Sequence, residues 1–256
     1  MNTLHRFEDG GYAFLEGGFP YSQGVVALPG FALERVQFDR PLPIAAGFLA
    51  IEAHLAALGR PRVALAGCEL RSPLALPMEG FRAFNVGYRQ VLESWGLIRN
   101  GLNPVGRSNL APLFDAPAEP SFFAFSYTVP EQGQARVIGA SGYPDFVVAG
   151  SGEWPEGEPF PEAIVARGDL SAAGLASKVA FVLDTMDRRG RGLGVDITHV
   201  TATHVYTVHD VHALIGREFA RRGLTRTGLT LFPCAPPILE LEFEMDLRRV
   251  RSEKII

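Results

Sequence analysis

Residues Phe146-Val147-Val148-Ala149-Gly150-Ser151-Gly152 form an apolar run that ends in glycines, and the prediction of the fold starts from this run. A similar run, Phe14-Leu15-Glu16-Gly17-Gly18, stands near the N-terminus. Each run is followed by the same order of predicted elements, with helices and strands alternating before two closing strands. This repeated β-β-α-β-α-β-β order indicates two like domains that arose by duplication, although few residues are identical between the halves.

Apolar periodicity gives the expected elements of each half. In the first half it predicts strands over 24–28, 63–70, 107–110 and 122–127, and helices over 41–59 and 81–95. In the second half it predicts strands over 146–152, 200–207, 228–232 and 239–246, and helices over 175–189 and 211–222, the first of them capped by Asp169 or Ser171. A stretch over 130–143 that is rich in glycine and glutamine is the predicted linker. The domains are therefore expected over residues 1–132 and 140–256.

Composition excludes several classes of protein. A net charge of −4 gives no basic footprint for nucleic acid, and the densest basic run, over 188–191, is expected to be a solvated helix end. No apolar run is long enough to span a membrane, and the N-terminus lacks the layout of a signal peptide. Two cysteines, Cys68 and Cys234, are too few for a disulfide framework. We therefore expect a cytoplasmic protein with neither a nucleic-acid nor a membrane partner.

Several motifs, taken in order, resemble the reactive intermediate deaminase (Rid) superfamily. The second half is similar to its Ser-Gly hairpin, its Thr-Thr-Val strand and its closing Glu-x-Glu strand at 148–152, 200–207 and 241–244. The first half is similar to its Asn-x-x-Tyr helix and its Arg-Ser strand, at 84–88 and 105–108. The shared order covers most of the chain. Relatives with two domains include the chorismatases, and relatives with one include 2-aminomuconate deaminase.

The resemblance implies an α+β fold of two tandem ferredoxin-like (chorismate-mutase-like) domains, each a mixed sheet with two helices on one face. It also implies packing in threes, hence a homo-oligomer with a trimer favoured, and ligand clefts between domains. The implied ligand is a small carboxylated substrate, and no cofactor or metal is implied. The substrate-binding residues carried over are Arg107, Ser108, Asn109, Asn85, Tyr88, Ser151 and Gly152.

Each half departs from the family pattern at one position. The substrate arginine of the family corresponds to Arg107 in the first half and to Thr227 in the second. The acid of its last strand corresponds to Glu242 in the second half and to the aromatic run 122–125 in the first. An arginine holds both oxygens of a carboxylate, which threonine cannot do. We therefore expect a composite site that combines Arg107 with Glu242.

The closing segment over 239–246 alternates apolar and acidic residues. A strand period of two places four acids on one face. Either this face is exposed to solvent, or it is partly buried between domains. In the second case the like charges raise the pKa of at least one carboxyl group toward neutrality. A carboxyl of that kind suits acid and base catalysis, and the resemblance selects Glu242 as the catalytic residue.

Several polar residues have plain structural roles as alternatives to chemistry. Arg107 could equally pair with an acid, and Tyr88 could serve the core. His204, His209 and His212 match no recognised metal spacing, and Asp210 beside them suits a helix cap. Neither cysteine has a neighbouring base in the sequence.

Three functions follow from these residues. The leading prediction is an enzyme that hydrolyses an imine or enamine of a small carboxylated metabolite, an aminomuconate-type intermediate of aminoaromatic degradation, with release of ammonia. The first alternative is chorismatase-like hydrolysis of an enol ether. The second is a non-catalytic protein of the same family that binds a small molecule.

Overall fold

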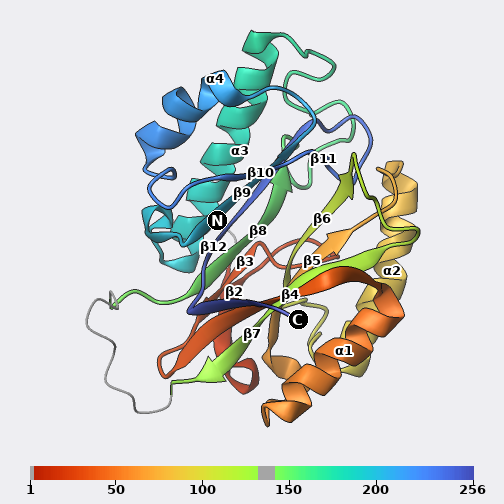
Figure 1. The fold of residues 1–256 in the computed structure, drawn as a ribbon, viewed down its shortest axis with the longest axis vertical. Helices are drawn as coiled ribbons and strands as arrows, with labels where there is room; N and C mark the ends of the chain where they lie inside the picture. The colour runs from red at the N-terminus through yellow and green to blue at the C-terminus, as the bar shows by residue number, and fades with distance from the viewer. Residues whose placement is uncertain (1–2, 132–141) are drawn as a thin grey trace.

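The computed structural model describes residues 3–131 and 142–256. Two mixed sheets face one another, and helices cover their outer faces, so that the described chain forms helix, sheet, sheet and helix layers (Figure 1). The described helices do not include one that is long and apolar enough to cross a membrane.

The first sheet has six strands and carries helices α1 (Ile44–Ala57) and α2 (Met78–Ser94). Its strands, in spatial order, are β11 (Cys234–Ala235), β6 (Gly106–Pro112), β5 (Leu65–Arg71), β7 (Ser121–Pro130), β4 (Phe31–Pro43) and β13 (Ser252–Ile255). Apolar residues of α1 and α2, among them Phe48 and Tyr88, pack on the sheet face that carries Phe122. These contacts explain why the helices lie on one side only.

The second sheet has seven strands and carries α3 (Ala172–Leu193). Its strands, in spatial order, are β1 (Leu4–Phe7), β2 (Tyr12–Leu15), β3 (Gly24–Ala27), β8 (Phe146–Gly152), β12 (Phe243–Arg249), β9 (Ala202–Thr207) and β10 (Thr230–Phe232). Ser171 caps α3, because its hydroxyl oxygen accepts the N–H of Gly174.

The two halves repeat one topology. The first half runs β4-α1-β5-α2-β6-β7, and the second runs β8-α3-β9-α4-β10-β12, with α4 at His212–Leu214. In the first sheet β7 lies antiparallel between β4 and β5, and β6 pairs in parallel with the other edge of β5. In the second sheet β12 lies antiparallel between β8 and β9, and β10 pairs in parallel with the other edge of β9. The predicted α+β fold with a tandem repeat is confirmed.

The sheets nevertheless exchange strands across the middle of the chain. The N-terminal strands β1 to β3 extend the second sheet through pairing of β3 with β8. The C-terminal strands β11 and β13 pair with β6 and β4 of the first sheet. The predicted linker falls largely on residues 132–141, outside the described residues, so the division of the chain at that point stays a prediction.

Three expected elements differ from the structure. Residues 31–40, for which no element is predicted, and residues 41–43, predicted as the start of a helix, form β4, the longest described strand. The closing strand begins at Phe243 instead of Leu239, because Glu240 lies at a positive φ of 76° and ends any extension toward its N-terminus. The helix expected over 211–222 is α4 followed by a π-turn at Ile215–Phe219 and a 3₁₀ turn at Ala220–Arg222.

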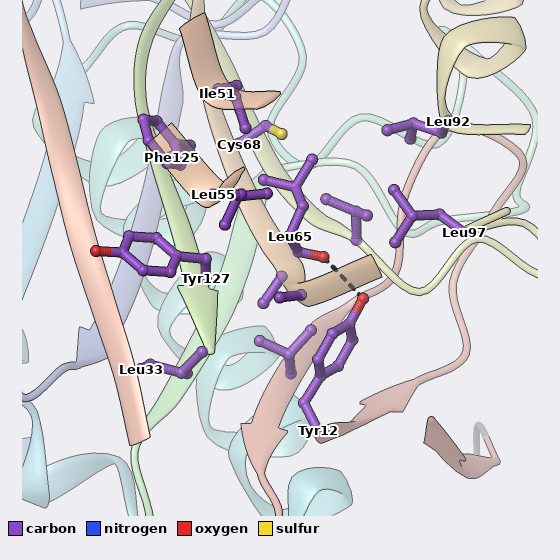
Figure 2. Close-up of a cluster of buried hydrophobic side chains, with 14 of the residues drawn as sticks. Tyr12, Leu33, Ile51, Leu55, Leu65, Cys68, Leu92, Leu97, Phe125 and Tyr127 are labelled. Atoms are coloured by element: carbon purple, nitrogen blue, oxygen red, sulfur yellow. Dashed lines mark hydrogen bonds between the residues drawn. The ribbon is translucent and has the colours of Figure 1, made fainter. Parts of the chain in front are cut away.

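Each sheet has its own apolar core under its helices. Figure 2 shows part of the first, where Leu65 and Phe125 of the sheet meet Ile51 and Leu55 of α1. Tyr12 enters this core from β2 of the other sheet, and its hydroxyl donates a hydrogen bond of 2.9 Å to the carbonyl oxygen of Leu65 (Figure 2). The N-terminal strands therefore tie the two sheets together.

The space between the sheets is polar. Arg35 of β4 makes two hydrogen bonds to Glu69 of β5, at 2.6 and 2.8 Å. On the facing sheet the Tyr206 hydroxyl donates to Asp246 at 2.7 Å. Each pair lies within one sheet, and it compensates part of the cost of burying charged groups between the two sheets.

Candidate active site

A cavity of about 300 Å³ opens where the ends of β6, β8 and β12 approach α2 and α3. Its walls come from both sheet layers and from three loops. The loop before β3 contributes Phe19 and Tyr21, and later loops contribute Trp154, Ile238 and Leu241. A volume of this size suits a small metabolite, and an apolar wall with few polar groups is typical of a ligand site.

Arg107 of β6 is the dominant polar group of the cavity. Its side chain is only 2% exposed, and its Nε, Nη1 and Nη2 atoms have no hydrogen-bond partner within the described residues. Four aromatic rings surround the guanidinium carbon, the closest being Tyr88 at 4.8 Å and Tyr21 at 5.0 Å. Burial lowers the pKa of Arg107, but an arginine stays charged at neutral pH. A buried cation of this kind is suited to an anionic ligand.

Five of the eight predicted site residues line this cavity. They are Arg107, Asn109, Asn85, Ser151 and Gly152. The Asn85 Oδ1 and Asn109 Nδ2 atoms are buried without a hydrogen-bond partner in the described part of the chain, so both can serve a ligand. Tyr88 supports Arg107 through its ring. Ser108, which points to the other face of β6, lines a separate cavity of about 20 Å³ beside Asp246.

Among the described residues two carboxyl groups line the cavity, Glu156 and Glu244. Glu156 accepts hydrogen bonds from Gly18 and Gln23, whereas Glu244 lies on β12. The side chain of Glu244 is buried, and burial followed by the nearby charge of Asp246 raises its pKa to about 8, against the lowering effect of Arg189 and Arg107. Glu244 is therefore mostly protonated at neutral pH. It packs so closely on Gly150 of β8 that a Cβ at that position would collide with its Oε1 atom.

Glu242 lies outside the lining of this cavity. Its Oε2 atom is 2.6 Å from Nε2 of His209, at the turn before α4. The acid of the closing segment that lines the same cavity as Arg107 is Glu244, two residues further along the chain. Of the other predicted acids, Glu240 is exposed and pairs with Arg167, whereas Asp246 is buried between the sheets.

Arg189 lines the cavity although no sequence motif predicted it as a site residue. The basic run over 188–191 is expected to be solvated, but the Arg189 side chain is 5% exposed and lines the cavity from α3. Its Nη1 atom donates to the carbonyl oxygens of Ala149 and Gly150, at 2.9 and 3.0 Å. Met186 and Leu193, three residues before and four residues after Arg189 on α3, pack in the second core. This helical periodicity is the signal that could have indicated a buried arginine.

The histidines and cysteines have separate roles. Within residues 3–131 and 142–256 no group of three or more histidine, cysteine or acidic side chains is placed to hold a metal ion. His204 contacts Arg248 at 2.8 Å, and burial with that positive charge lowers its pKa to about 2. His212 pairs with Asp210. Cys68 is buried, and burial raises its pKa to about 12, so it is not a thiolate nucleophile at neutral pH.

Comparison with known proteins identifies the family. The model of the family described as "2-aminomuconate deaminase CnbZ" matches residues 4–254. A protein of Comamonas testosteroni described as 2-amino-5-chloromuconate deaminase is 43% identical over 251 residues, which are 98% of each chain. The chain belongs to the CnbZ family of 2-aminomuconate deaminases. The resemblance to aminomuconate deaminases that the motifs indicate is thereby confirmed.

One solved structure, a chorismatase, shares the fold of this CnbZ family member. The chorismatase superposes with a TM-score of 0.50 at 13% identity, over 94% of this chain and 77% of its own. The YjgF gene product from E. coli gives a TM-score of 0.32 at 15% identity, over 48% of this chain and 93% of its own. At these identities the chorismatase supports only the fold, and it agrees with the predicted tandem architecture.

Proposed function

We propose that this CnbZ family member hydrolyses the enamine or imine of an aminomuconate-type metabolite and releases ammonia. One observation carries the proposal: a buried arginine without a partner in the described chain and a carboxyl group with a pKa of about 8 line one cavity. Arg107 would hold a substrate carboxylate, and Glu244 would move the protons. Asn85, Asn109, Ser151 and Gly152 would complete the substrate contacts. Tyr88 would support Arg107 through its ring, and Ser108 would act from the smaller cavity on the other face of β6.

The protonated state of Glu244 suits the first step. Glu244 donates its proton to the enamine carbon that does not carry the nitrogen, and the substrate becomes an iminium ion. Water then adds to the C=N carbon, and the Glu244 carboxylate takes the proton that the water loses. In the last step Glu244 protonates the amine, the C–N bond breaks, and ammonia leaves. The remaining hydroxyl returns its proton to Glu244 as it becomes a ketone, so the residue ends as it began.

The direct test is an assay of ammonia release. The purified protein is mixed with 2-aminomuconate, and ammonia and the oxo acid are measured together. We expect the two products in equal amounts. Absence of both, with a folded protein, would favour a binding protein without catalysis. A chorismatase-like activity rests on likeness of fold alone, and release of pyruvate from chorismate would be its sign.

The pH profile gives a second test. We expect kcat/KM to fall as pH rises through about 8, because the proton donor is then lost from the free enzyme. Asp246, Glu153, Arg189 and Arg107 are the charged groups that act on Glu244. Changing Asp246→Asn removes a negative neighbour, so the pKa of Glu244 should decrease and the alkaline limb should move to lower pH. A profile that rises through pH 8 would assign Glu244 as a base in the free enzyme.

Arg107→Lys tests carboxylate binding. Lysine keeps the charge but loses the paired donors that hold both oxygens. We expect KM to rise roughly 10- to 100-fold with a smaller change in kcat, because a charge-assisted hydrogen bond contributes about 1.5–3 kcal/mol. Steady-state kinetics of ammonia release measure this. An unchanged KM would leave Arg107 a purely structural role.

The proposal extends to assembly and location. We infer a homo-oligomer, with a trimer favoured, because the Rid resemblance implies packing in threes. Leu113 and Phe114 after β6 are 57% and 67% exposed, which supports self-association. Sedimentation that gives only a 27.8 kDa species would contradict it. The free cysteines Cys68 and Cys234 support a reducing, cytoplasmic setting.

A further inference from the structure

Arg107 and Arg189 reach the same cavity from opposite layers of the fold. Arg107 lies on β6 of the six-stranded sheet, and Arg189 lies on α3 over the seven-stranded sheet. Both side chains are at least nine-tenths buried. Both also lower the pKa of Glu244, so they act on the carboxyl group from separate elements. A cavity with two buried cations is more than one carboxylate requires.

A β-bulge accounts for the two hydrogen bonds that the Nη1 atom of Arg189 donates. Between the pairs Met245–Ser151 and Leu247–Val148 the register of β8 and β12 shifts, so Ala149 and Gly150 stand opposite one residue. The two carbonyl oxygens at this bulge accept from Nη1 of Arg189. Nη1 therefore has a structural role and fixes the orientation of the planar group.

The other edge of the guanidinium, formed by Nε and Nη2, takes no part in the hydrogen bonds to the bulge carbonyls. Nε is buried and has no hydrogen-bond partner among the described residues. Nη2 lies 3.7 Å from Oε2 of Glu156, beyond hydrogen-bond distance. Glu156 is already bound, because its two oxygens accept from Gly18 N at 2.6 Å and from Gln23 Nε2 at 2.8 Å. The Nε–Nη2 edge is the edge with which an arginine holds both oxygens of a carboxylate.

We propose that Arg189 binds a second carboxylate of the substrate, so that the cavity selects dicarboxylates over monocarboxylates. Arg107 holds one end of a linear conjugated diacid and Arg189 holds the other. The lining supports this charge balance, because Arg107 and Arg189 are the two arginines of the described lining that are at least nine-tenths buried. These two buried positive charges match a dianion. The proposal rests on the proposed function only in placing both events in the same cavity.

The test compares two unreactive ligands of the same chain length. trans,trans-Muconate is a linear conjugated dicarboxylate without an amine, and sorbate, which has the same double-bond geometry, is its monocarboxylate counterpart. Calorimetry on the full chain should show that muconate binds the unmodified protein roughly 10- to 100-fold more tightly than sorbate. In Arg189→Lys, which keeps the charge and can still donate to the bulge carbonyls, muconate should lose about tenfold in affinity. Sorbate should change by less than about twofold.

Arg82→Gln is the matched control, because Arg82 lines the same cavity but is exposed. We expect it to keep the preference for muconate. Equal weakening of both ligands in Arg189→Lys would show that Arg189 only anchors the bulge, and would overturn the proposal. So would the absence of a preference in the unmodified protein, or its loss in Arg82→Gln alone. If Arg189→Lys does not fold, the Arg189 Nε–H resonance of the unmodified protein must shift with muconate and not with sorbate.

The two proposals fail separately. Preference for muconate that depends on Arg189, without ammonia release from 2-aminomuconate, would retain the dicarboxylate site and reject the deaminase. Ammonia release with a preference that is independent of Arg189 would retain the deaminase and reject the second carboxylate contact.

Discussion

Glu244→Gln is expected to lower kcat for ammonia release by about 10²- to 10⁴-fold, the usual contribution of a general acid or base. Glutamine keeps the shape of the side chain but cannot donate a proton to the enamine carbon or accept one from water. Because Glu244 is mostly protonated at neutral pH, the neutral amide should preserve substrate binding. Single-turnover kinetics and calorimetry with muconate separate the two effects.

Glu242→Gln is the matched control for this experiment. The two acids lie two residues apart, but the Glu242 carboxylate is engaged by His209 at 2.6 Å and lies outside the cavity lining. We expect a change of only a few fold in kcat. A large loss in Glu242→Gln with little loss in Glu244→Gln would return the proton transfer to the residue that the sequence resemblance selects.

This pair of acids shows the limit of strand periodicity as a guide to a site. Alternation over 239–246 predicts that the four acids share one face of a strand, but only Glu244 and Asp246 lie within β12, and Glu242 precedes its first residue. It cannot tell which of them stands at the cavity, because a period of two is the same at every step along a strand. The choice depends on where β12 begins and on the bulge opposite Asp246, and both are tertiary features.

The repeat itself could be predicted because its causes are local. Apolar residues at helical or strand spacing predict α1, α2, α3, β5 and β8 close to their observed bounds. The pairing of β3 with β8, and of β13 with β4, could not be predicted in this way. These contacts join residues far apart in the chain, and no local pattern encodes which sheet edge a strand will choose.

Arg189 illustrates the same gap for a single side chain. A run of arginines at the end of a helix is usually solvated, and Arg188 and Arg191 are exposed as expected. Arg189 is buried because its position on α3 faces β8, where a bulge offers two carbonyl oxygens. Recognition of a buried cation requires knowledge of its acceptors, which lie about forty residues away in the chain.

Lys178→Met is expected to destabilise the protein by about 3–5 kcal/mol, the usual cost of leaving one partner of a buried ion pair alone. Lys178 of α3 and Glu153 after β8 are fully buried, with Nζ and Oε1 3.2 Å apart. Glu153 also accepts the backbone N–H groups of Glu242 and Phe243, at 2.7 and 3.1 Å. The pair therefore holds the start of β12, the strand that carries Glu244. Thermal unfolding should show a decrease in Tm of roughly 6–20 °C.

The dependence of this loss on pH follows from Glu153. Burial already raises the pKa of Glu153 above its ordinary value, and removal of the lysine charge raises it further. A carboxyl whose pKa is higher in the folded state opposes folding once pH exceeds its unfolded value. The deficit of Lys178→Met should therefore be largest at neutral pH and shrink as pH falls and Glu153 takes up a proton. The double variant Glu153→Gln with Lys178→Met removes both charges, so it should be more stable at neutral pH than Lys178→Met alone. A double variant as unstable as the single one would mean that the cost lies in lost packing of the lysine chain, and not in the unpaired carboxylate.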